Sequence, residues 1–281
     1  VQETDRHLTL RGKNFTYNFN KLTGLFAAMQ YEDAVLLDKE MEFNIWRAPT
    51  DNDRKLKLDW LAARYDHCMT NAYRTEYQVT DSGVTLRAKV GIAPISLQKF
   101  LDLDVCWTVS NSGAVTLALH AERNTVFPEL PRFGLRLFLP ESFAKLTYCG
   151  LGPVESYVDK HQASYHGVFH STPAEQQEDY IRPQENGSHY DCDYASLASD
   201  RAVLTAVGEK TFSFQASIYT QEELTAKAHN YELRPCGSTV FCIDYRQAGI
   251  GSASCGPMLL EKYQLKETEI SFDVRLKPEL L

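Results

Sequence analysis

The chain has 281 residues, 43% of them hydrophobic, and 29 lysines and arginines against 37 aspartates and glutamates give it a formal net charge of −8. This acidic balance, with no stripe of basic residues, argues against a nucleic-acid partner and against membrane-surface binding. Because no run of about 18 apolar residues is present, we expect a soluble chain, either cytoplasmic or periplasmic. Seven cysteines without a C-x-x-C pair predict reduced and mostly buried thiols.

Alternation of apolar and polar residues dominates the chain and predicts antiparallel strands with one buried face. Phe15–Phe19 and Leu25–Met29 flank a Gly-containing turn and predict a hairpin. Two helices are expected, at Asp59–Asp66, with Trp60, Leu61 and Ala63 on one side, and at Thr220–His229, where Thr220 precedes Glu223 as in a capping box. Further strands are predicted at Val84–Val90, Val115–Leu119, Gly134–Leu139, Thr211–Ser217, Val240–Asp244 and Ser271–Leu276.

Strands that succeed one another without ten-residue helices between them favour an antiparallel sandwich over a parallel sheet. We therefore expect an all-β fold, a single β-sandwich domain over residues 1–281, since no linker divides the chain. The middle, Tyr148–Asp193, is rich in Gly, Pro, Tyr, His and carboxylates. It is expected to be loop-rich and to hold the function.

Several residues suggest chemistry but have simpler explanations. His161, His166 and His170 lie close together, yet their spacings match no zinc motif, so no metal site is predicted. Cys255 has no His near it in sequence, which makes a pocket wall more plausible than a nucleophile. A glutamate pair for glycoside chemistry could always be found among 37 carboxylates. The nominees are Glu155, Glu185 and Glu232, for which structural roles are favoured.

Four segments hold combinations that propensity alone does not require. They are R-A-P-T-D-N-D at Arg47–Asp53, Y-C-G-L-G-P-V-E-S-Y-V-D at Tyr148–Asp159, R-P-Q-E-N-G at Arg182–Gly187 and A-G-I-G-S-A-S-C-G-P at Ala248–Pro257. Each alone is explained by turns and by glycines with positive φ. R-F-G at Arg132–Gly134 and I-D-Y at Ile243–Tyr245 accompany them.

Together and in this order, these segments resemble the C-terminal, small-chain-like domain of family 2 glycoside hydrolases, the β-galactosidases of the lac type. The resemblance implies a large antiparallel β-sandwich (supersandwich) of the galactose-mutarotase-like type. It places this domain last of five in a retaining β-galactosidase whose acid/base and nucleophile glutamates lie in a preceding barrel. No catalytic residue is then expected in this chain, and the isolated chain should be inactive.

The resemblance also assigns residues. It places Ser254, Cys255 and Gly256 at the rim of the substrate pocket, with Cys255 where other members carry Trp. It makes Arg47, Asp51, Asn52 and Asp53 part of a mobile loop near the pocket, although Arg54 and Lys55 follow where many relatives have a glycine hinge. It gives structural roles to the remaining motif residues, Gly152, Glu155, Tyr157, Asp159, Gln184, Glu185 and Asn186.

The expected partners are the barrel and other domains of the same enzyme, a β-galactoside in the shared pocket and further copies in a homo-oligomer. Mg²⁺ and Na⁺ belong with the barrel, and no metal or cofactor is expected here. Two alternatives stay open. One is an aldose 1-epimerase-like enzyme with His120, His166 or His189 as acid and Glu155 or Glu185 as base. The other is a stand-alone carbohydrate-binding module, for which 3 Trp, 15 Tyr and 14 Phe could offer stacking faces.

Overall fold

The structure is a computed structural model that describes residues 1–252 and 255–281. Strands dominate it, and its helices are short. The first strands are β1 (Gln2–Glu3), β2 (His7–Arg11), β3 (Phe15–Asn20), β4 (Leu25–Tyr31), β5 (Ala34–Val35) and β6 (Lys39–Asn44). They are followed by β7 (Cys68–Thr80), β8 (Gly83–Pro94), β9 (Leu101–Ser110), β10 (Val115–Arg123), β11 (Arg132–Pro140) and β12 (Lys145–Gly152). The last are β13 (Tyr165–Ser171), β14 (Ser188–Ala198), β15 (Ala202–Ser217), β16 (Ser238–Gln247) and β17 (Glu269–Leu280). The helices are α1 (Leu56–Ala62), α2 (Gln221–Ala226) and the 3₁₀ turns η1 (Asn52–Arg54), η2 (Asn230–Glu232) and η3 (Glu261–Tyr263).

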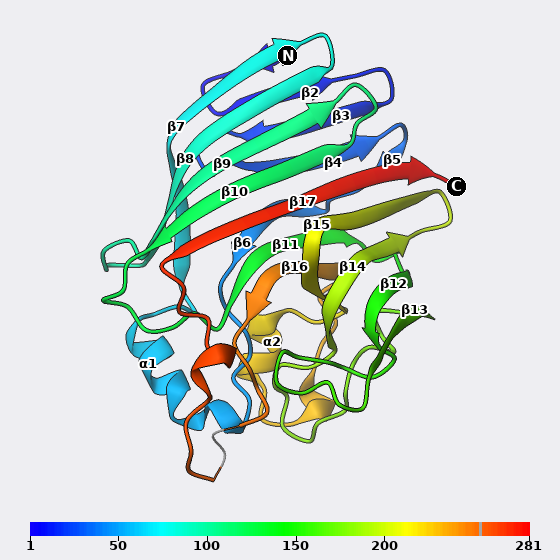
Figure 1. Cartoon of the computed structure of the whole chain (residues 1–281). Helices are drawn as coiled ribbons and strands as arrows, with labels where there is room; N and C mark the ends of the chain where they lie inside the picture. Colours follow the sequence, from blue (N-terminus) through cyan, green and yellow to red (C-terminus); the bar gives the residue numbers. More distant parts are fainter. Residues whose placement is uncertain (253–254) are drawn as a thin grey trace.

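Two antiparallel sheets form the body of the molecule. The smaller has the order β1-β2-β3-β4-β5, and the larger runs β13-β12-β14-β15-β17-β10-β9-β8-β7. The long strand β15 makes the larger sheet branch, because its first half pairs with β17 and its second half with β16. From β16 the branch continues through β11 to β6. Figure 1 shows the small sheet lying behind the long strands β7–β10.

A continuous apolar core joins the two sheets. Trp107 of β9 packs edge-on against Phe26 of β4, and its indole Nε1 donates a hydrogen bond to the carbonyl of Gly24 at 2.9 Å. Gly24 has φ +75°, and a Cβ there would lie 2.9 Å from Val90, so this turn requires glycine. The expected all-β sandwich is confirmed.

The predicted strands are confirmed, and the clearest alternation, Val84–Val90, lies in β8 with Leu86, Ala88 and Val90 buried. The helix predictions need correction. The first helix spans Leu56–Ala62 and ends where Arg64 adopts φ +55°, and Leu61 is exposed.

The second helix stops at Ala226. The expected Thr220 cap is present, since its hydroxyl accepts from the Glu223 amide at 3.1 Å. The thiols are also less buried than expected. Only two of the seven, Cys192 and Cys242, are buried, while four are partly exposed and Cys255 is exposed.

The middle of the chain is more regular than expected. The second part of β12, all of β13 and the beginning of β14 lie within Tyr148–Asp193, and these strands form one edge of the larger sheet. Long loops, α1 and α2 gather at one end of the sandwich, at the bottom of Figure 1, away from the end that carries the N-terminus. Among the described residues, none of the helices has the length and apolarity needed to cross a membrane.

Candidate functional site

Arg47 anchors the extended segment that follows β6. Its guanidinium is fully buried and donates hydrogen bonds to the carbonyls of Ala248 and Gly249, the latter at 3.1 Å, and to Asp53 at 2.8 Å. It also lies 5.1 Å from the centre of the Trp60 ring. A buried carboxylate that loses its counter-charge is strongly destabilising, so Arg47 and Asp53 depend on each other. Arg47 thereby ties residues 47–53 to the loop after β16.

Asp159 holds the same loop from the other side. Its two carboxylate oxygens accept hydrogen bonds from the backbone amides of Ile250, at 2.9 Å, and Gly251, at 2.8 Å. Asn52 donates from its side chain to the Ile250 carbonyl at 2.6 Å. A Cβ on Gly249 would lie 2.5 Å from the Asp159 carboxylate, so this close approach requires glycine. Residues 249–251 are thus clamped between the 47–53 and 150–159 segments.

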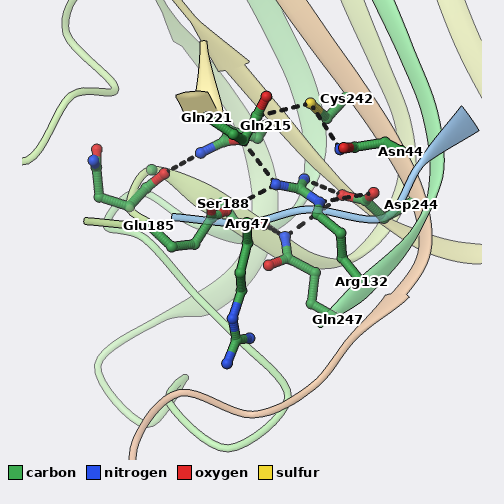
Figure 2. Close-up of polar contacts among 12 residues, drawn as sticks. Asn44, Arg47, Arg132, Glu185, Ser188, Gln215, Gln221, Cys242, Asp244 and Gln247 are labelled. Carbon is green, nitrogen blue, oxygen red and sulfur yellow. Dashed lines mark hydrogen bonds and ion pairs between the residues drawn. The ribbon is translucent and has the colours of Figure 1, made fainter. Parts of the chain in front are cut away.

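Figure 2 shows a second set of buried polar contacts, an ion network around Arg132. Arg132, at the start of β11, donates to both carboxylate oxygens of Asp244 on β16, to Glu185 at 3.1 Å and to the side-chain carbonyl of Gln215 on β15 at 3.2 Å. The side chains of Arg132, Asp244 and Glu185 have no exposed surface. One guanidinium therefore joins β11, β15, β16 and the P-Q-E-N-G loop.

The guanidinium of Arg132 pairs with two buried carboxylates, those of Glu185 and Asp244, and the charge of Arg47 also acts to lower the pKa of Glu185, against the larger effect of burial. Burial raises the pKa of Glu185 to about 7 despite the nearby guanidinium of Arg132. Burial also raises the pKa of Asp244, against the same guanidinium. For Arg132, burial acts to lower the pKa, but Asp244 and Glu185 outweigh it and raise the pKa well above its ordinary value. Burial thus favours the protonated form of both carboxyl groups, and for Glu185 it brings the pKa close to neutral pH.

Glu155 closes a second buried junction. Its carboxylate accepts hydrogen bonds from the Gly187 amide at 3.0 Å, from the hydroxyls of Tyr157, at 3.3 Å, and Tyr180, and from the ammonium of Lys160. Burial and the Glu155 charge raise the pKa of Tyr180. Glu155 is thus occupied within the chain and fixes the loop at Gly187.

The P-Q-E-N-G loop also contacts the 47–53 segment directly. The Glu185 amide donates to the Ala48 carbonyl at 2.9 Å, and the Asp51 amide donates to the side chain of Gln184 at 3.2 Å. Asn186 accepts from the Glu178 amide at 3.0 Å. All four sequence segments therefore meet in one connected set of hydrogen bonds.

Two of the three residues expected at the pocket rim are among the residues that the structure describes. Cys255 and Gly256 are exposed at the loop end of the molecule, whereas Ser254 lies outside the described residues. Gly152 is buried, and a Cβ there would lie 2.2 Å from the hydroxyl of Tyr148. The rim role and the mobility of residues 47–53 stay predictions.

Sequence reasoning did not nominate Arg132, Gln215 and Asp244, which the structure makes central, nor Gln247, whose side-chain amide donates to the Ser188 hydroxyl at 2.9 Å. The R-F-G and I-D-Y motifs contain Arg132 and Asp244, so the signal was present as motif membership without an assigned role. Gln215 and Gln247 sit within strands, and pattern alone does not separate them from ordinary polar strand residues.

The epimerase alternative requires a histidine and a glutamate that converge on an open sugar site. His189 and Glu185 are 0% and 1% exposed, and His189 is engaged by the Gln176 side chain and the Leu151 carbonyl. Burial lowers the pKa of His189 to about 4. These two nominees are therefore closed off from a ligand, while His120 and His166 lie on strands β10 and β13.

Comparison with known proteins identifies the family. The family model described as the β-galactosidase small chain matches residues 11–276. The chain belongs to the β-galactosidase small-chain family. The β-galactosidase of Actinobacillus pleuropneumoniae is 42% identical over 276 residues, which cover 98% of this chain and 27% of that protein. The β-galactosidase of Staphylococcus xylosus is 35% identical over 278 residues, 99% of this chain and 28% of that protein. This small-chain family member thus spans little more than a quarter of the length of these relatives.

Solved structures agree on the fold. A galactose 1-epimerase from Lactobacillus acidophilus superposes with a TM-score of 0.52 at 8% identity, covering 100% of this chain and 97% of its own. A galactose mutarotase-like protein from Lactobacillus casei superposes with a TM-score of 0.50 at 8% identity, covering 97% of this chain and 100% of its own. The galactose-mutarotase-like fold expected for the small-chain family is therefore confirmed.

Proposed function

We propose that this chain is the non-catalytic β-sandwich portion of a retaining β-galactosidase. In this proposal the loop that contains Cys255 lines the rim of a pocket whose two catalytic glutamates belong to the barrel of the same enzyme. The barrel, the other domains and further copies of the enzyme are its partners, and a terminal β-galactoside is the substrate of the shared pocket. Mg²⁺ and Na⁺ act with the barrel.

The observation that carries the proposal is the clamp on residues 249–251. Arg47, Asn52 and Asp159, from two separate motif segments, hold the stem of the loop that leads to Cys255. A loop that borders another domain's pocket must keep one geometry, since misplacement of about 1 Å can cost a hundredfold in rate. The motif residues provide that geometry.

The buried glutamates support a non-catalytic role. Glycoside hydrolysis needs two carboxyl groups that reach the scissile bond from either side. Glu155 accepts four hydrogen bonds from its own chain, and Glu185 is inaccessible beside Arg132. Neither can contact a sugar without dismantling the junction that it holds.

The test begins with the purified 281-residue chain and a chromogenic β-galactoside. We expect no turnover above a heat-inactivated control, and measurable turnover would overturn the proposal. Calorimetry with galactose and lactose is run on the same chain. Binding there would favour a stand-alone carbohydrate-binding module, whereas a pocket wall shows none without the barrel.

The second arm uses the full-length enzyme that contains this chain. Asp159→Asn weakens the clamp and is expected to raise KM for a β-galactoside several-fold. Glu141→Gln, on an exposed turn, serves as the control. An unchanged KM in the Asp159 variant would contradict the rim role.

A further inference from the structure

A cluster of three metal-ligand types lies on the edge of the larger sheet, away from the clamp. Cys149 of β12, His166 of β13 and Asp193 of β14 come from three adjacent strands, at the right of Figure 1. The Cys149 sulfur lies 3.4 Å from Asp193 Oδ2, and His166 Nε2 lies 3.3 Å from the same oxygen. All three ligand atoms lie within 4.8 Å of one another.

We propose that Cys149, His166 and Asp193 form a binding site for a divalent transition metal of the zinc class. For a tetrahedral ion with a Zn–S distance of about 2.3 Å and Zn–N and Zn–O distances of about 2.0 Å, the sulfur–oxygen separation is about 3.5 Å and the nitrogen–oxygen separation about 3.3 Å. The observed separations of 3.4 and 3.3 Å match these values. Two of the three separations are thus those of a tetrahedral site, and the third, between the Cys149 sulfur and the His166 nitrogen, is at most 4.8 Å.

The backbone explains why these three side chains meet. Leu151 pairs with His166 across β12 and β13, and since Cys149 is two residues from Leu151 it shares that face. Directly opposite Cys149 on β14 is Tyr194, so a regular strand would point Asp193 to the other side. The pairing of β14 with β15 is irregular between Cys192 and Tyr194, around Asp193, and the Asp193 carboxylate accepts a hydrogen bond from the Cys149 thiol. Such bulges commonly redirect a side chain.

The donor set selects the metal. Thiolate and imidazole favour zinc-class ions, whereas Mg²⁺ and Ca²⁺ prefer all-oxygen sites. On binding, the Cys149 thiol releases its proton to the buffer as the sulfur–metal bond forms. A 2+ ion with one thiolate, one carboxylate and a neutral imidazole leaves no net charge. The His166 and Asp193 side chains are 45% and 54% exposed, which admits water as a fourth ligand.

The site would act as a staple of the sheet edge. β13 is the outermost strand of its sheet, and it is bonded to β12 alone among the described strands. A metal that joins β12, β13 and β14 binds the folded arrangement and not the unfolded chain, so it raises the melting temperature.

The test is a titration of the metal-free 281-residue chain with Co²⁺, followed by competition with Zn²⁺. We expect one equivalent of Co²⁺ to give thiolate-to-cobalt charge-transfer absorption with the visible bands of a four-coordinate ion. Zn²⁺ displaces it, and excess Mg²⁺ does not. Cys149→Ser abolishes the charge-transfer band, and His166→Gln and Asp193→Asn weaken Co²⁺ binding by about tenfold or more.

Cys106→Ser and His170→Gln are the matched controls, one on β9 and one on the same strand as His166. Both should retain the full absorption. Absence of the charge-transfer band in the wild-type chain overturns the proposal regardless of how the variants fold. A band that survives Cys149→Ser, or that is lost in Cys106→Ser, places the metal elsewhere and overturns it equally.

Discussion

Glu185→Gln is expected to change how the free energy of unfolding depends on pH. The pKa of Glu185 is raised by burial from 4.5 to about 7, so the folded state holds this proton more tightly than the unfolded chain does. Stability from the bound proton is therefore complete below pH 4.5 and is lost as the pH rises toward 7. At about 1.4 kcal/mol for each pKa unit, the loss is about 3 kcal/mol. Glutamine mimics the protonated side chain and removes this loss.

In the wild-type protein, the buried imidazole of His189 offsets the effect of Glu185 on the pH dependence of the free energy of unfolding. Burial lowers the pKa of His189 from 6.5 to about 4, so its neutral form is favoured in the folded state. That contribution is present above pH 6.5 and is lost as the pH falls toward 4. The two slopes oppose each other over most of the same range. Only the difference between variant and wild type isolates Glu185, because the His189 contribution cancels in it.

The assay is urea unfolding of the wild type, Glu185→Gln and the exposed control Glu141→Gln, at pH values spaced from about 4.5 to about 7. The stability of Glu185→Gln relative to wild type should rise by about 3 kcal/mol across this range, and that of Glu141→Gln should stay nearly constant. A flat difference for Glu185→Gln, or one that grows toward acid, would refute the reasoning that burial dominates over the Arg132 charge.

Three further outcomes are expected. Asp159→Ala removes two charge-assisted hydrogen bonds, so hydrogen exchange at residues 250–251 should accelerate by about tenfold or more in mass spectrometry. Gly187→Ala should cost about 2 kcal/mol or more in urea unfolding, since φ is +67° and the new Cβ would lie 2.3 Å from a backbone carbonyl. Cys255→Trp in the full-length enzyme should lower KM for aryl β-galactosides a few-fold, because an indole contributes more contact area than a thiol; an equal KM would contradict the rim position.

The strands were predictable because burial of one sheet face imposes a period of two. Leu86–Val90 shows this directly, since its buried and exposed residues alternate as its sequence does. β7 escaped prediction because no residue of it is fully buried and its apolar residues do not alternate regularly with polar ones. The first helix was misplaced because its end depends on the left-handed backbone at Arg64, which hydrophobic pattern does not report.

The sequence could predict which segments form the site, but it could not predict which residues contact one another there. Motif resemblance named the loops around Arg47, Asp159 and Glu185, but Arg132 and Asp244 are 112 residues apart, and their pairing follows from the register of β11 against β16. The cluster at Cys149 shows the same limit. The histidine spacing around His166 matches no metal motif along the chain. The other two proposed ligands, Cys149 and Asp193, come from neighbouring strands.

The contribution of the buried ion network to stability does not by itself explain why charged side chains are buried there. A buried ion pair is often no more stabilising than apolar side chains of the same volume, because desolvation offsets the attraction. Apolar contacts, however, permit neighbouring segments to slide, whereas hydrogen bonds from one planar guanidinium are directional. Arg132 fixes β16 and the P-Q-E-N-G loop in this way, and Arg47 fixes the stem that follows β16. Under the proposed function, a loop that borders another domain's pocket needs one geometry more than it needs the lowest free energy, which accounts for the buried charge.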